Sequence, residues 1–257
     1  METTPTTKTP RAPFLPVFHY PEGYRGPNSP AEQLVRLVRI FGLDPGPALT
    51  LSQHLPKLPY GAEGWFVVPT DDALKRKFFR KAVSADEKFT HIRRLMLRKV
   101  AEHVVLNFWR DLFRLDPQNL RSCERTKRAL ERIAITQADS DFLIIPAQLG
   151  LRHYDRSPDQ AREFFIGSAH APEALARGDE FGLGIVEISS ILLTHHERLY
   201  RDQDLGMDCT GEAFAPQGDG NYSYVNTFGF EDERVHIRTS PSNHVRRAFA
   251  TPSGFII

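Results

Sequence analysis

The chain has 257 residues, 40% of them hydrophobic, and a formal net charge of +1. A chain of this length can bury a core that needs no disulfide or metal, and it predicts one large domain. The charge is polarised: residues 71–132 carry 17 lysines and arginines against 9 acidic residues, whereas residues 133–257 carry 10 against 18. Since no run of about 20 apolar residues occurs, the sequence excludes a membrane-spanning helix.

The cysteine content and the start of the chain bear on the compartment. Two cysteines, Cys123 and Cys209, are too few for a disulfide framework and favour a reducing environment. The N-terminus shows no charged segment followed by an apolar one, so we expect no signal peptide and a cytoplasmic protein. The phosphate-binding, dinucleotide, nucleophile-elbow, zinc-protease and CxxC signatures are all absent from the sequence, so no reaction or cofactor is predicted.

The first thirty residues differ in composition from the rest. Seven prolines and a threonine-rich start predict an extended or disordered arm over residues 1–30, with a single globular domain over 31–257. Ser29, Pro30 and Glu32 form a capping box with proline at the first helical position, which predicts a helix that ends at Gly42.

The basic segment reads mostly as helices. Residues 64–69 form a short apolar strand, and Thr70 caps a helix whose first turn is acidic. A second capping box at residues 84–87 opens a long helix to about residue 113. Its second part, residues 100–113, is apolar around most of its circumference and is predicted to be the central buried helix. Another basic helix is expected to start at residues 116–117.

The acidic segment mixes helices and strands. Residues 141–146 are an unbroken apolar run, which predicts a strand buried on both faces. Helices are expected from Ser157 and over residues 182–198, where His195 faces the core and His196 is more exposed. Alternating patterns then predict strands at residues 205–210, 222–230, 234–239 and 253–257, with a turn at 231–233.

Together these elements predict an α/β or α+β fold. A basic, helical N-terminal half packs on a mixed sheet that C-terminal antiparallel strands complete.

The first candidate site follows the strand at 141–146. This strand and the one at 64–69 both end in proline and polar groups, and if they are parallel neighbours their carboxyl ends face one crevice. The loop would then supply Gln148, Arg152, His153 and Arg156 to a phosphate-bearing or other anionic ligand. The structural alternative is a solvated polar loop after a core strand.

Catalytic chemistry at that site would need acid and base groups. Asp208 and Glu212, with His153, are the candidates for general acid/base work. The two carboxylates could also hold Mg²⁺, although no ligand set defines a metal site. Cys209 lies among acidic residues, which disfavours a nucleophilic thiolate.

The alternative function is noncatalytic binding of nucleic acid or protein on the basic helical surface at residues 75–99. Arg93, Arg94 and Arg98 are then free to meet phosphates, and we expect them to face solvent. The competing interpretations are an ordinary solvated helix face and pairing with the acidic half, within one chain or between subunits. A homo-oligomer therefore stays open.

Overall fold

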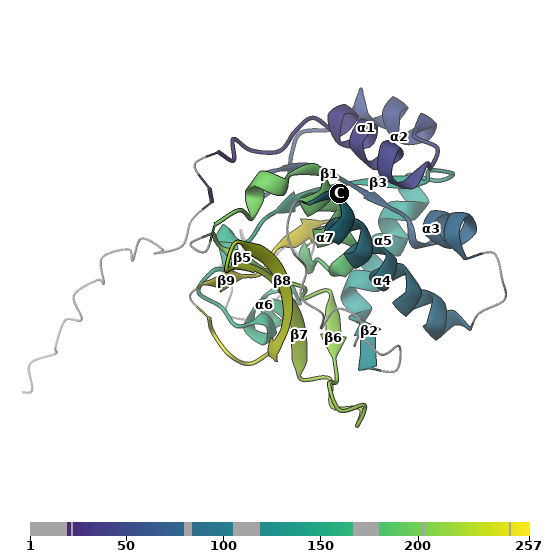
Figure 1. The fold of residues 1–257 in the computed structure, drawn as a ribbon. Helices are drawn as coiled ribbons and strands as arrows, with labels where there is room; N and C mark the ends of the chain where they lie inside the picture. Colours follow the sequence, from purple (N-terminus) through teal and green to yellow (C-terminus); the bar gives the residue numbers. More distant parts are fainter. Residues whose placement is uncertain are drawn as a thin grey trace, which may run out of the picture.

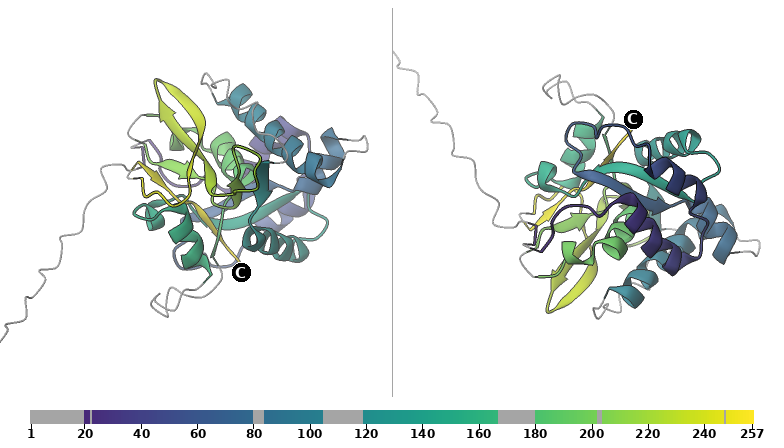
Figure 2. Two further views of the ribbon diagram at one scale, coloured as in Figure 1. Left: turned by 90° about the horizontal axis from the view of Figure 1, so that it is seen from below. Right: turned by 90° about the horizontal axis from the view of Figure 1, so that it is seen from above.

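The computed structural model describes residues 20–21, 23–79, 84–104, 119–166, 180–201, 204–246 and 248–257. Helices and two sheets build an α+β fold, as expected. The helices of the first hundred residues gather on one side and the C-terminal hairpin on the other (Figures 1 and 2). Most of the expected arm, residues 1–19, lies outside the described residues.

The first sheet has four antiparallel strands in the order β1-β3-β10-β4. Every residue of β3 is buried, which confirms the strand predicted at 141–146. The strands are β1 (Gly64–Pro69), β3 (Phe142–Gln148), β10 (Ser253–Phe255) and β4 (Glu180–Gly182).

The two early strands do not have the parallel arrangement on which the first candidate site depended. Gly64 pairs with Ala147 and Pro69 with Phe142, so β1 and β3 are antiparallel and their carboxyl ends lie at opposite edges. An apolar run reports that both faces of a strand are covered, but it carries no information on strand direction. The end of β3 therefore faces the start of β1.

The second sheet contains the strands predicted at 205–210, 222–230 and 234–239, whereas the one predicted at 253–257 is β10 of the first sheet. A hairpin joins β7 to β8 through Asp232 and Glu233, both at positive φ, as a tight hairpin turn requires. Its strands are β2 (Leu120–Ser122), β6 (Glu212–Phe214), β7 (Tyr224–Glu231), β8 (Arg234–Pro241), β5 (Gly206–Asp208) and β9 (Phe249–Ala250). The β5–β9 pair is parallel, so this sheet is mixed.

The N-terminal helices follow their caps. The helix α1 (Pro30–Phe41) has the predicted capping box and ends at Gly42, where φ is +62°. Thr70 caps α3 (Asp71–Phe78), and Ser84 opens α4 (Ala85–His103). A short helix that the sequence did not indicate, α2 (Gly46–Ser52), follows α1. The rest of the long predicted helix, residues 105–113, lies outside the described residues.

The later helices depart from the predicted bounds. The helix α5 (Glu124–Thr136) starts after the strand β2, so Leu120 belongs to a sheet rather than to a helix. Residues 116–117, the expected start, are not among the described residues. Ser157 caps α6 (Pro158–Phe165) as predicted. Short 3₁₀ turns cover η3 (Leu151–His153) and η4 (His196–Arg198).

The helix α7 (Ile185–Thr194) is buried along its whole length. It packs against α4, β1 and α1, and Figure 1 shows it in the middle of the molecule. The helix is shorter than predicted, since it ends before His195. His195 is buried, as expected, and His196 is exposed. Within the described part of the chain, every helix is too short or too polar to cross a bilayer.

Candidate functional site

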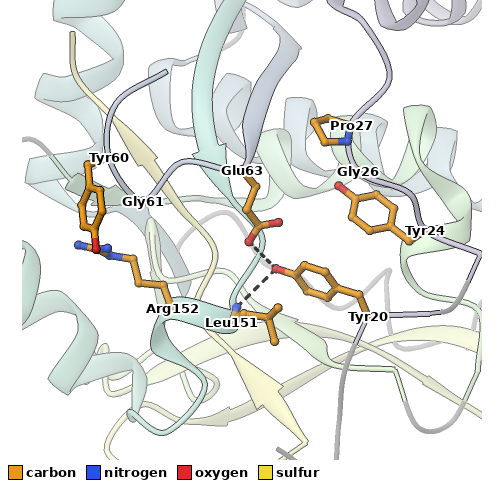
Figure 3. Close-up of a pocket in the computed structure, with 9 residues that line it drawn as sticks. All are labelled: Tyr20, Tyr24, Gly26, Pro27, Tyr60, Gly61, Glu63, Leu151 and Arg152. Carbon is orange, nitrogen blue, oxygen red and sulfur yellow. Dashed lines mark hydrogen bonds between the residues drawn. The ribbon is translucent and has the colours of Figure 1, made fainter. Parts of the chain in front are cut away.

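A pocket of about 560 Å³ opens at the edge where β1 begins and β3 ends. Three segments meet there: the chain before α1, the loop before β1 and the turn η3 after β3. Figure 3 shows the lining residues, which are Tyr20, Tyr24, Gly26, Pro27, Tyr60, Gly61, Glu63, Leu151 and Arg152. Three aromatic rings, one carboxylate and one guanidinium therefore surround a single hollow.

Glu63 and Tyr20 form the polar centre of the pocket. The Tyr20 hydroxyl donates to Glu63 Oε1 at 2.6 Å, and the Leu149 amide donates to the same oxygen at 3.0 Å. Burial raises the pKa of Glu63, although these two donors and the charge of Arg198 oppose the rise. The Arg198 guanidinium is fully buried and stacks 4.1 Å from the centre of the Tyr20 ring. This carboxylate is thus held in place from two sides.

Tyr24 lines the pocket beside Tyr20. The two rings meet edge to face at 5.5 Å, and Tyr24 also contacts the ring of His195 at 6.2 Å. Its hydroxyl oxygen is buried and has no hydrogen-bond partner among the described residues. Burial raises the pKa of this hydroxyl, and the charge of Glu63 adds to the rise. A neutral, unsatisfied hydroxyl is costly to bury unless something else binds it.

Arg152 supplies the positive charge of the pocket. Its Nε lies 3.4 Å from Glu180 Oε2, and its guanidinium lies 5.9 Å from the ring centre of Tyr60, which is 81% exposed. Gly61, at a φ of +92°, allows this approach, because a Cβ there would lie 2.5 Å from Arg152 Nη1. Arg152 is the one predicted binding residue that lines the pocket.

The other residues predicted from the same loop lie in an internal network. Gln148 accepts from the Gly150 amide at 2.6 Å and donates to Ser253 Oγ at 2.8 Å. His153 is fully buried, with Nε2 2.6 Å from Glu180 Oε1 and Nδ1 2.6 Å from Arg156 Nη1. Burial lowers the pKa of His153, so the ring is a neutral link between Arg156 and Glu180.

This network does not have the arrangement of a nucleophilic triad. Ser253 and His153 both contact the same oxygen of Glu180. In a triad the histidine stands between the hydroxyl and the carboxylate and takes the proton of the hydroxyl. Here the carboxylate stands in the middle, so the arrangement holds Glu180 in place and does not activate Ser253.

Asp208 and Glu212, the predicted acid/base pair, belong to two separate ion pairs. Asp208 pairs with Arg246, and burial raises the pKa of Asp208 to about 7. Glu212 accepts from Arg93 Nε at 2.8 Å, and burial raises its pKa as well. Neither lines the pocket. No cluster of three metal-ligating side chains occurs among the described residues.

The basic surface is partly neutralised within the chain. Arg93 is 5% exposed and pairs with Asp71 at 2.5 Å and with Glu212, so the expectation that it faces solvent is wrong. Arg98 is exposed and lies 3.7 Å from Glu102. Arg94 is half-buried and also interacts with other residues. Nothing in the local sequence distinguishes Arg93 from its basic neighbours, because its buried partner, Glu212, lies 119 residues away in the chain.

Comparison of the chain with protein-family models, curated proteins and solved structures gives no match. Its function therefore has to be inferred from the site itself. Sequence reasoning located the loop that carries Arg152 but missed Tyr20, Tyr24, Tyr60 and Glu63. A cluster of tyrosines in proline-rich connections was the available signal, and it became a site only when three loops converged.

Proposed function

We propose that this protein binds a small ligand with an anionic group, which contacts Arg152 in the pocket at the β1–β3 edge. The observation that carries the proposal is the pocket of about 560 Å³ in which one guanidinium and three tyrosine rings converge. A volume of this size suits a small organic molecule, and a mostly apolar lining with a few polar groups is typical of ligand sites.

The charge of Arg152 argues for an anion. A guanidinium stays protonated at any physiological pH and binds carboxylate or phosphate through two parallel hydrogen bonds. The ion pair with Glu180 runs through Nε, which leaves the Nη edge for such a contact. Tyr60 stands beside the guanidinium with most of its ring exposed, so it offers a flat apolar wall to the ligand.

Nucleic-acid binding on the helical surface at 75–99 is the weaker proposal. Several of its cations already have acidic partners: Lys75 with Asp72, Arg76 with Asp141, and both Arg98 and Lys99 with Glu102. A phosphate backbone would have to displace these carboxylates. A titration with a generic duplex from low to high salt tests this function directly.

The test of the main proposal is equilibrium binding by calorimetry to a panel of phosphates and carboxylates. Arg152→Gln should weaken binding of every anion that the wild-type chain takes, by roughly tenfold or more. Arg128→Gln is the matched control, because Arg128 is exposed, pairs with Glu124 on its own helix and does not line the pocket. Equal affinity of both variants would contradict the proposal, provided that circular dichroism shows both folded.

A further inference from the structure

We propose that the ligand of this pocket is a polyhydroxylated anion, of the sugar phosphate or sugar acid class, with one hydroxyl bound between Glu63 and Tyr24 and its anionic group at Arg152. The inference rests on the proposed function. It adds the chemical nature of the part of the ligand that lies away from Arg152.

Glu63 offers one free acceptor to the pocket. The two hydrogen bonds that it accepts within the described chain both end on Oε1, from Tyr20 and from the Leu149 amide. Figure 3 shows the other carboxylate oxygen on the side of Tyr24. A carboxylate has room for about four donors, so Oε2 can accept a hydrogen bond from a ligand.

Tyr24 offers the complementary donor. Its hydroxyl is buried and has no hydrogen-bond partner in the part of the chain that the structure describes, and its ring lies next to that of Tyr20. Tyr24 and Glu63 line the same pocket, and Figure 3 shows their side chains next to each other there. A ligand atom that accepts from Tyr24 would satisfy a group that the protein leaves unpaired.

The acceptor of Glu63 and the donor of Tyr24 together favour a ligand group that can both donate and accept a hydrogen bond. A hydroxyl donates one hydrogen bond and accepts others, so a single hydroxyl can serve Glu63 and Tyr24 together. An ammonium group only donates, and a carboxylate only accepts. The buried guanidinium of Arg198 also acts on Glu63, which disfavours a ligand cation at this end.

The rest of the pocket suits a hydroxylated ring. The rings of Tyr20, Tyr24 and the exposed Tyr60 line the pocket, and the C–H faces of a sugar ring can pack against aromatic rings. In Figure 3 the Arg152 guanidinium lies beside Tyr60, and the Glu63 carboxylate lies between that pair and Tyr24, so a ligand can meet Arg152 and Glu63 with different groups. A volume of about 560 Å³ accommodates a hexose phosphate.

The experiment measures binding by calorimetry to four probe types: a set of hexose and pentose phosphates with hexuronates, phenyl phosphate, phosphocholine, and free glucose. At least one polyhydroxylated anion should bind more tightly than phenyl phosphate by about tenfold, and glucose should bind weakly because it lacks the anion. Tyr24→Phe, which keeps the ring, should weaken the sugar anion by about 3- to 10-fold and leave phenyl phosphate unchanged.

Two further variants sharpen the result. Glu63→Gln keeps an oxygen for Tyr20 and Leu149 but replaces the free acceptor by an amide donor, so it should also weaken only the hydroxylated probes. Tyr222→Phe is the control, because Tyr222 contacts Arg121 and does not line the pocket.

The outcomes separate the two proposals. If no anion binds, the proposed function fails and this inference fails with it. Suppose that phenyl phosphate binds as tightly as any sugar anion, that its affinity falls in Arg152→Gln and that it is unchanged in Tyr24→Phe. The proposed function then stands and this inference is overturned. Tightest binding of phosphocholine, lost in Glu63→Gln, would overturn it in favour of a cation at Glu63.

Discussion

Arg93 Nε donates a 2.8 Å hydrogen bond to Glu212 Oε1, which joins α4 to β6 across 119 residues of chain. Arg93 also reaches Asp71 at 2.5 Å, so one buried guanidinium serves two carboxylates. Part of the polarised charge of the sequence is thus neutralised inside the fold, where Arg93 of the basic helix α4 pairs with Glu212 of a strand from the acidic half.

Replacing Arg93 by Gln should destabilise the protein strongly. The substitution leaves Glu212 and its neighbour Glu187 buried without their cation, and breaking one side of a buried pair costs about 3–5 kcal/mol. Arg98→Gln removes the same charge from the exposed face of the same helix, where a pair contributes only about 0–1 kcal/mol. Urea unfolding of both variants measures the difference, and similar midpoints would show that Arg93 does not hold the core.

Glu187 should make the protein less stable as the pH rises. Burial raises its pKa from 4.5 to about 7, against the attraction of Arg93 and with repulsion from Glu212. The folded state therefore binds a proton that the unfolded chain releases above pH 4.5. The resulting stabilisation is full below pH 4.5 and is lost as the pH rises through 7, by roughly 1–3 kcal/mol.

Unfolding of Glu187→Gln and wild type between pH 5 and 8 isolates this effect. The variant should gain stability relative to wild type as the pH rises, because Gln stays neutral. Subtracting the two curves removes the titration of Asp208 and the histidines, which both proteins share. Glu124→Gln, on an exposed helix position, should give a flat difference. A flat difference for Glu187→Gln as well would mean that Glu187 is ionised in the fold.

His195 should be needed as a hydrogen-bond acceptor. Its Nε2 accepts from the Asn28 amide at 2.8 Å, and burial lowers its pKa to about 4, so the ring is neutral at pH 7. His195→Phe keeps an aromatic ring against Phe66 but leaves that amide unpaired, which should cost about 1–3 kcal/mol. His196→Phe changes the adjacent, exposed residue and should be nearly neutral in a thermal melt. Equal losses would point to a general effect of the loop.

Gly61→Ala should reduce anion binding although it replaces no charged residue. The backbone there has a φ of +92°, and the added Cβ would lie 2.5 Å from Arg152 Nη1, so the guanidinium must move. We expect a loss of about 1–2 kcal/mol in stability and about tenfold in affinity for the anions that bind the wild type. Gly23→Ala is the control, since, apart from its chain neighbours, no atom of the described residues lies within 4 Å of its Cβ position. Unchanged affinity in Gly61→Ala would place the anion elsewhere.

Local sequence determined the elements whose cause is local. Ser29, Ser84 and Ser157 each form a capping box with the residue three positions on, and each helix begins where its box predicts. The apolar run of β3 and the alternation of the C-terminal hairpin likewise predicted buried strands. These signals depend on backbone groups and side chains within a few residues, so they can be read from the chain alone.

Short elements carried too little signal. The strands β2, β4, β6 and β9 have two or three residues each and give little pattern. The equally short β5 and β10 lie within the longer stretches 205–210 and 253–257, where alternation predicted strands. They exist because neighbouring strands of the same sheet supply their hydrogen bonds. The predicted start of α5 is too early for the same reason. Leu120 fits the helical spacing of the sequence, but it pairs with Phe214 of β6 and belongs to a strand.

Tertiary structure alone decided the direction of β1 against β3, the burial of Arg93 and the composition of the pocket. Each depends on groups far apart in the sequence: Gly64 against Ala147, Arg93 against Glu212, Tyr20 against Glu63. Composition and spacing indicate which residues can be buried or charged, and the sequence therefore indicated Arg152 as a candidate binding residue. Which partner each group meets depends on how the chain closes its loops, and only the folded arrangement places three tyrosines around Arg152 and Glu63.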